Sequence, residues 1–246
     1  MEKLWKYIII STAMVLAAMV IASAYTERHR THTGTITVTG LGETMFTSDH
    51  IIIKGSLSIE NMDAAEGYRL MERDRNKVVS FIEQHGVAKN AVKFAMLSHY
   101  EMTTSLYQDG KYIGEKFSGY RLTQDFTIES TDIDAVESVA QELASLLADG
   151  VNISVQEPMY IYSDLNTLKL DLIAAAAADA RARAELIATN SNTELGELNW
   201  SSAGVFQITS ATGDEEFSAG GAFNLSSREK KARVTVRAEY KIDNHR

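Results

Sequence analysis

Histidines are the residues of this sequence best suited to bind a metal ion or to carry a proton near neutral pH. His29 and His32 lie three residues apart and could share a metal on a helix, although solvated side chains explain the pair more simply. His50, His85 and His99 are isolated in the sequence, so only the folded chain could bring them into one site. The histidine spacing therefore assigns no metal-ligating residue.

Acidic and basic side chains form two further groups. Residues 214–216 (Asp-Glu-Glu) lie in a glycine-rich stretch and could attract a cation, but a calcium site needs more ordered oxygen ligands than this run offers. Asp179, Arg181 and Arg183 are of types that could form an acid–base group, yet their spacing is typical of a solvated helix face with local ion pairs. Neither group is assigned a catalytic role.

The local signatures of several enzyme classes are missing. The sequence has no Gly-x-x-x-x-Gly-Lys, His-Glu-x-x-His or Gly-x-Ser-x-Gly motif. Gly40 and Gly42 lack the third glycine of a dinucleotide-binding motif, so a turn or bulge is the better interpretation. Cysteine is absent, which removes disulfides, thiolate metal sites and a cysteine nucleophile. The sequence therefore predicts a non-enzymatic protein with no cofactor.

The composition is that of a folded, acidic protein. The chain has 246 residues, of which 45% are hydrophobic and 23% are charged. Asp and Glu number 33 against 24 Lys and Arg, which gives a net charge of −9. A chain of this charge repels phosphate backbones, so we expect no nucleic-acid partner.

Residues 1–30 contain a targeting signal. Lys3 and Lys6 precede an uncharged stretch, residues 7–26, that is long enough to span a bilayer as a helix. Residues 22–24 (Ala-Ser-Ala) fit the end of a cleavable signal peptide. We therefore expect residues 1–30 to be a signal peptide or an N-terminal membrane anchor. Either places the remaining chain on the periplasmic side of the cell envelope, anchored in the inner membrane by residues 7–26 or released after cleavage near Ala24.

Hydrophobic periodicity beyond residue 33 alternates between strand and helix spacing. It predicts strands over 35–39, 51–59, 91–107, 115–129, 151–155, 198–208 and 233–242. It predicts helices from Asn61 to about 86, from Thr131 to Gly150 and over 163–190. Asp-Gly within residues 108–111 is a strong hairpin signal, and residues 209–227 have the composition of a surface loop.

This order of elements predicts an α+β class. We expect two α/β subdomains, about 33–129 and 130–242, with mixed, largely antiparallel sheets covered by helices and preceded by one N-terminal hydrophobic helix. Four aromatic side chains surround the expected hairpin: Tyr107, Tyr112, Phe117 and Tyr120. Packing on a sheet face is their ordinary role, but a cluster outside the core would indicate a protein or membrane contact.

Several short motifs occur in an order that resembles the SIMPL-domain family, which includes the YggE-like and outer-surface immunogenic proteins of the bacterial envelope. The motifs are residues 36–43 (Ile-Thr-Val-Thr-Gly-Leu-Gly-Glu), 48–49 (Ser-Asp), 118–121 (Ser-Gly-Tyr-Arg), 168–188 and 195–198 (Leu-Gly-Glu-Leu). Residues 229–231 (Glu-Lys-Lys) depart from the Pro-Gly that family members often have before the last strand. The resemblance covers about residues 34–242, within the region 31–246 that we expect to be SIMPL-like.

The resemblance implies an envelope protein that forms homo-oligomers and has a role in stress tolerance, without a set of catalytic residues. We therefore expect a non-enzymatic exported protein that self-assembles through strand edges and hairpins, with a stress-protective or structural role. The alternative is a periplasmic binding module that holds a small ligand or peptide between its subdomains.

Overall fold

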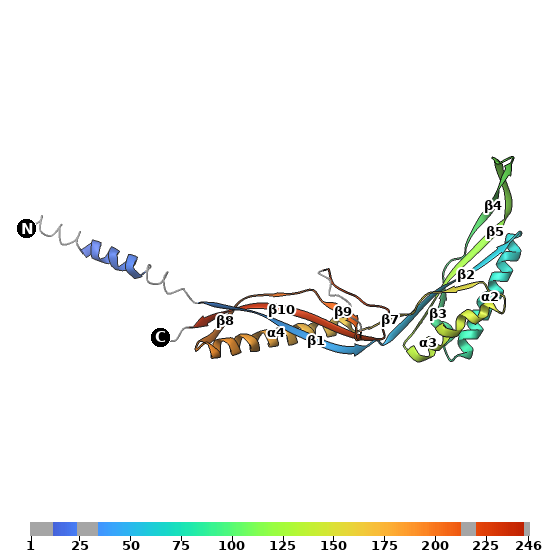
Figure 1. Ribbon diagram of the computed structural model, residues 1–246. Helices are drawn as coiled ribbons and strands as arrows, with labels where there is room; N and C mark the ends of the chain where they lie inside the picture. The colour runs from blue at the N-terminus through green and yellow to red at the C-terminus, as the bar shows by residue number, and fades with distance from the viewer. Residues whose placement is uncertain (1–11, 24–33, 213–219, 244–246) are drawn as a thin grey trace, which may run out of the picture. The chain divides into compact units, whose positions relative to one another are not determined.

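The computed structural model describes residues 12–23, 34–212 and 220–243 and has the expected α+β fold (Figure 1). Residues 12–23 form a helix, and within the described ranges no helix is long and apolar enough to cross a membrane. The expected span, residues 7–26, begins and ends outside the described residues, and so does the expected cleavage position at Ala24.

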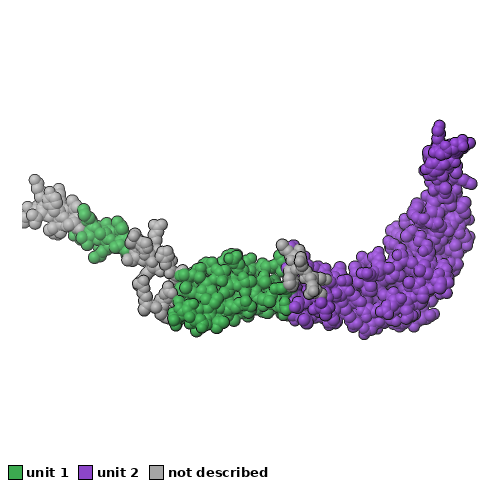
Figure 2. Space-filling model, viewed as in Figure 1, with its two compact units in different colours: residues 1–43, 170–205, 233–246 green, residues 44–169, 206–232 purple. Residues whose placement is uncertain are grey.

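The chain forms two compact units, which Figure 2 colours separately. Unit 1 comprises residues 1–43, 170–205 and 233–246, and unit 2 comprises residues 44–169 and 206–232. The expected subdomains are consecutive, about 33–129 and 130–242, whereas these compact units interleave along the chain. The difference arises because three long elements have residues in both units: β1 (Thr35–Thr47), α4 (Leu165–Asn190) and β10 (Glu229–Asp243).

In unit 1, α4 packs on one face of a sheet of strand order β1-β10-β8, in which β8 (Glu194–Ala203) is antiparallel to β10. Every second residue of β10 is buried from Val234 to Tyr240, as expected for a strand covered on one face. The helix buries every fourth residue: Leu172, Ala176, Ala180, Ala184 and Ala188. Leu165 and Leu168 are only half-buried, so alanines rather than leucines form most of the buried stripe.

The alanine stripe is matched by Gly40 and Gly42 on β1. A Cβ atom added to Gly40 would lie 2.1 Å from the carbonyl oxygen of Ala176, and one added to Gly42 would lie 2.1 Å from that of Leu172. The prediction of a turn is therefore wrong. These glycines lie inside β1, where their missing side chains let the helix backbone approach the strand closely.

Unit 2 contains a sheet of order β3-β5-β2-β6, formed by β3 (Val92–Phe94), β5 (Lys111–Ser130), β2 (His50–Asn61) and β6 (Ile153–Val155). The strand β4 (Ser98–Gln108) also pairs with β5, and β7 (Met159–Ile161) also pairs with β2. The helices α2 (Ala64–Gln84) and α3 (Ile133–Glu142) bury their apolar residues against this sheet. Two 3-10 turns, Lys89–Ala91 and Leu143–Leu147, and the strand β9 (Gln207–Ser210), which pairs with β10, complete the described elements of unit 2.

Element boundaries follow local hydrogen bonds that periodicity alone does not resolve. Asp63, not the predicted Asn61, caps α2 by accepting a hydrogen bond from the backbone N–H of Ala65 at 2.8 Å. Asp132 caps α3 in the same way, one residue after the predicted Thr131. The predicted strand 91–107 is two strands, β3 and β4, and the predicted strand 198–208 is divided between β8 and β9.

Candidate interaction surface

The three histidines within the described ranges, His50, His85 and His99, are not grouped into a metal site. His50 Nε2 lies 3.1 Å from Glu129 Oε1, and His85, which follows α2, donates from Nδ1 to the carbonyl oxygen of Phe81 at 2.8 Å. His99 lies on β4, while His29 and His32 lie outside the described residues. Among the residues that the structure describes, no three side chains of His, Asp or Glu are grouped to hold a metal ion.

Neighbouring residues shift the pKa of His85 and that of Glu129, the partner of His50. The carbonyl oxygen of Phe81, and then Glu142 at 3.2 Å from Nε2, raise the pKa of His85 because both favour the protonated ring. Lys93, and then His50, lower the pKa of Glu129 by hydrogen bonding to its charged form. Both pKa shifts arise from contacts within the chain, so neither requires a ligand.

Asp179 is not part of a fully solvated helix face. Its Oδ2 accepts hydrogen bonds from the backbone N–H of Leu41 at 2.8 Å and from Nε of Arg183 at 2.9 Å. The Leu41 bond contributes most to the lowered pKa of Asp179. The carboxylate therefore joins α4 to the edge strand β1. The prediction of local ion pairs is confirmed for Arg181, which bonds Glu185 at 2.8 Å. Residues 214–216, the other predicted acidic group, lie outside the described residues.

A polar network in unit 2 has residues that could carry out acid–base chemistry and that sequence spacing does not reveal. Tyr160 donates to Glu137 at 2.7 Å, and Arg228 donates to Asp134 at 2.6 Å and to Glu137 at 3.4 Å. Burial, and then the hydrogen bond to Glu137, raise the pKa of Tyr160 to about 12. Since the phenol stays protonated at neutral pH, it acts as a hydrogen-bond donor that ties β7 to α3.

Unit 2 also has an open hollow of about 760 Å³ on the surface of α2 and the 3-10 turn Leu143–Leu147. Its cationic side chains already have partners, because Arg73 pairs with Asp74 at 2.8 Å and Lys77 donates to the carbonyl oxygen of Asp149 at 2.7 Å. A ligand would therefore have to compete with these bonds, and the hollow offers no converging set of unengaged charges.

The most distinctive surface of unit 2 is the hairpin of β4 and β5, which projects beyond α2 (Figure 1). Its turn is confirmed at Asp109 and Gly110, whose φ angles of 52° and 78° fit the left-handed turn that Asp-Gly favours. Pairing of β5 with β2 ends at Tyr120 opposite Asn61. Within the described ranges, residues 111–119 therefore pair only with β4, and the outer edge of β4 has no strand partner.

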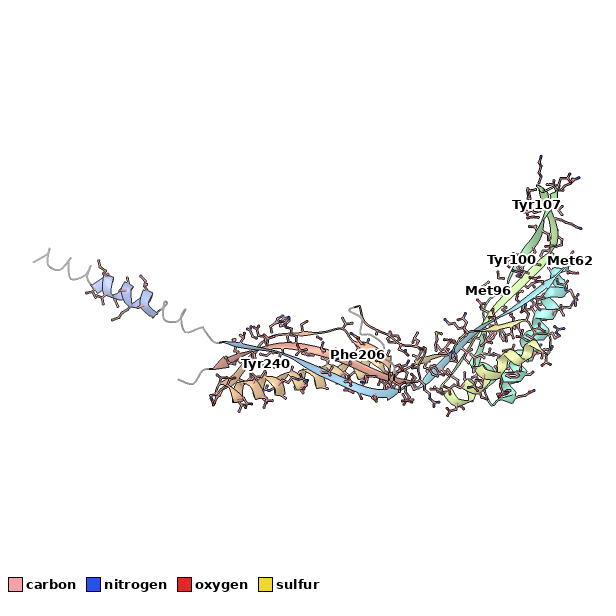
Figure 3. The ribbon with its side chains drawn as sticks, viewed as in Figure 1. Met62, Met96, Tyr100, Tyr107, Phe206 and Tyr240 are labelled. Atoms are coloured by element: carbon pink, nitrogen blue, oxygen red, sulfur yellow. The ribbon has the colours of Figure 1, made fainter. Side chains whose placement is uncertain are left out.

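The hairpin has exposed aromatic side chains on the face that continues the core side of the sheet. Tyr107 and Tyr112 are 67% and 57% exposed, and their rings meet edge-on with centroids 6.0 Å apart. Phe117 and Tyr120 form a second edge-on pair at 5.2 Å, but only Tyr120 packs against the core. Figure 3 shows Tyr107 near the end of the hairpin. The predicted aromatic group thus lies mainly outside the core.

Tyr100, on the opposite face of the hairpin, is held in place by Arg121. Arg121 donates from Nη1 to the hydroxyl of Tyr100 at 3.0 Å and from Nε to Glu60 at 2.7 Å. The guanidinium carbon also lies 5.8 Å from the centre of the Tyr100 ring. Sequence spacing does not indicate the group of Arg121, Tyr100 and Glu60. The group forms only when β2 and β5 pair in the register that places Glu60 opposite Arg121.

Comparison with models of known protein families shows which family the chain belongs to. The model of SIMPL, described as a protein of unknown function (DUF541), matches residues 36–240. The chain belongs to the SIMPL family. No curated protein matches this SIMPL chain. The matched region contains the whole hairpin.

Proposed function

We propose that this SIMPL protein is a non-enzymatic component of a homo-oligomeric assembly in the cell envelope, with a structural or stress-protective role. The observation that supports the proposal best is the β4–β5 hairpin, which combines exposed Tyr107 and Tyr112 with strand edges that have no partner in the described part of the chain. Unpaired edges are templates for another strand, and natural proteins usually shield them. Exposed aromatic residues beside such an edge are typical of a protein contact.

Location in the envelope rests on the apolar N-terminal stretch, residues 7–26, and on the implication of the SIMPL resemblance. Membrane attachment by this segment or release after cleavage near Ala24 are both compatible with the proposal. Mass measurement of the N-terminus of the exported protein distinguishes the two.

The test of self-assembly is the absolute mass of the purified full chain, measured by light scattering with correction for bound detergent. We expect a discrete multiple of 27.2 kDa, and we expect the double variant Tyr107→Ser/Tyr112→Ser to shift toward the monomer. Leu170→Ser and Leu186→Ser are matched controls, because these side chains on α4 are equally exposed but lie in unit 1. A monomeric wild-type chain would refute assembly and favour the binding-module alternative, for which ligand-dependent stabilisation is the measurement.

A further inference from the structure

The outer edge of β4 is suited to pair with the same edge of a second copy of this chain. The strand has eleven residues, Ser98–Gln108, without proline, and its one carboxylate is Glu101. In the part of the chain that the structure describes, no backbone group from another strand meets this edge. The pairing of β4 with β5 shifts register between Met102 and Thr103 and between Leu106 and Tyr107, where β5 has the extra residue each time. The edge of β4 itself lacks the proline or cover that often prevents strand addition.

We propose that two copies join by antiparallel pairing of their β4 strands about a two-fold axis at Thr103. This inference rests on the proposed function, and it names the contact through which two copies of the chain assemble. Thr103 is the middle residue of β4, so this register pairs the strand over its full length. The two-fold axis makes the contact self-complementary, as a closed dimer interface requires.

The register matches side chains on both faces of the joined sheet. On one face, Tyr100 lies opposite Leu106 of the second copy, and Met102 lies opposite Thr104. On the other face, His99 lies opposite Tyr107, and Glu101 lies opposite Ser105. Tyr100 thus meets an apolar side chain, Met102 meets a small one and Tyr107 meets the ring of His99, while no two like charges are directly opposed. A two-fold axis at Glu101 would instead place the two Glu101 carboxylates against each other.

The same contact covers the most exposed apolar side chain at the base of the hairpin. Met96 is 93% exposed and lies close to the start of β4 (Figure 3). Since Ser98 lies opposite Gln108 in this register, the turn of the second copy would lie beside Met96. Tyr100, which is 48% exposed, would pack against Leu106 while Arg121 holds it in place. One contact therefore accounts for exposed apolar groups at both ends of β4.

The absence of cysteine allows a direct test in the full chain, because any disulfide must come from an introduced residue. Directly opposed residues of antiparallel strands have Cα atoms roughly 4.5–5.5 Å apart, within the range of a disulfide. We expect Thr103→Cys to form a covalent dimer on mild oxidation, seen on a non-reducing gel. Thr104→Cys is the matched control, since each Thr104 would lie about 8 Å from its copy.

A mixing experiment tests the same register with residues away from the axis. Glu101→Cys and Ser105→Cys should each stay uncrosslinked alone and form a disulfide dimer when the two proteins are mixed. Crosslinking of Thr104→Cys without Thr103→Cys would overturn the proposed register. A wild-type oligomer in which neither Thr103→Cys nor the mixture crosslinks would overturn the β4 contact and leave the proposed assembly standing. A wild-type monomer would overturn both. Thermal unfolding of each variant confirms that the fold is intact.

Discussion

Replacing Gly40 with alanine should destabilise unit 1 strongly, because the new methyl group would meet the backbone of α4. The Cβ atom would lie 2.1 Å from the carbonyl oxygen of Ala176, 2.3 Å from the nitrogen of Ala180 and 2.8 Å from its Cα. Ordinary contact begins at 3.4 Å, so helix and strand must separate by about 1.3 Å. A gap of this size also removes much of the dispersion attraction along the buried alanines.

We expect Gly40→Ala to lower the free energy of unfolding by about 3 kcal/mol, the upper part of the usual range for overpacking. For a chain of this size, the midpoint of thermal unfolding should fall by about 6–12 °C. Circular dichroism at 222 nm measures the midpoint, and hydrogen exchange of the α4 amides locates the effect. Loss of protection should begin at residues 172–184.

Two further variants separate this mechanism from a general effect of losing a glycine. Gly67→Ala, inside α2, meets the end of the Leu122 side chain at 2.7 Å and improves helix propensity, so its net effect should stay within about 1 kcal/mol. Adding Ala180→Gly to Gly40→Ala should not restore stability, because the colliding atoms of Ala180 belong to its backbone. An unfolding midpoint of Gly40→Ala within 2 °C of wild type would refute the close-packing argument.

Three other changes test local electrostatics and the hairpin edge. For Asp179→Asn, the stability difference from wild type should be complete above the usual pKa of 3.8 and disappear as pH falls through the lowered pKa of Asp179, measured by urea unfolding. For His85→Gln, the difference should be complete below pH 6.5 and shrink as pH rises through the raised pKa of His85, so equal differences at about pH 5.5 and about pH 9 would contradict the assignment. Thr103→Lys combined with Glu115→Gln should weaken assembly most at low salt, because it removes the carboxylate that Thr103 contacts and opposes two ammonium groups across the axis. Light scattering that shows no salt dependence would count against β4 pairing.

Local features of the sequence were sufficient to predict the α+β class and the hairpin. Asp109 and Gly110 fix the turn because their backbone angles suit a two-residue connection, whatever the rest of the chain does. The helices over 64–84 and 165–190 were predicted to within a few residues from their sequence pattern. Family membership was also predictable, because it depends on motif order along residues 36–240.

The division into compact units and the roles of Gly40, Asp179 and Arg121 were decided only by tertiary structure. Each depends on a partner distant in sequence: Ala176 for Gly40, Leu41 for Asp179 and Glu60 for Arg121. Periodicity specifies which face of a helix or strand is apolar, but it does not specify which element covers that face. The sequence thus determined most of the elements and the hairpin turn, while long-range packing determined which glycines accommodate a helix and which strand edge has no partner among the described residues.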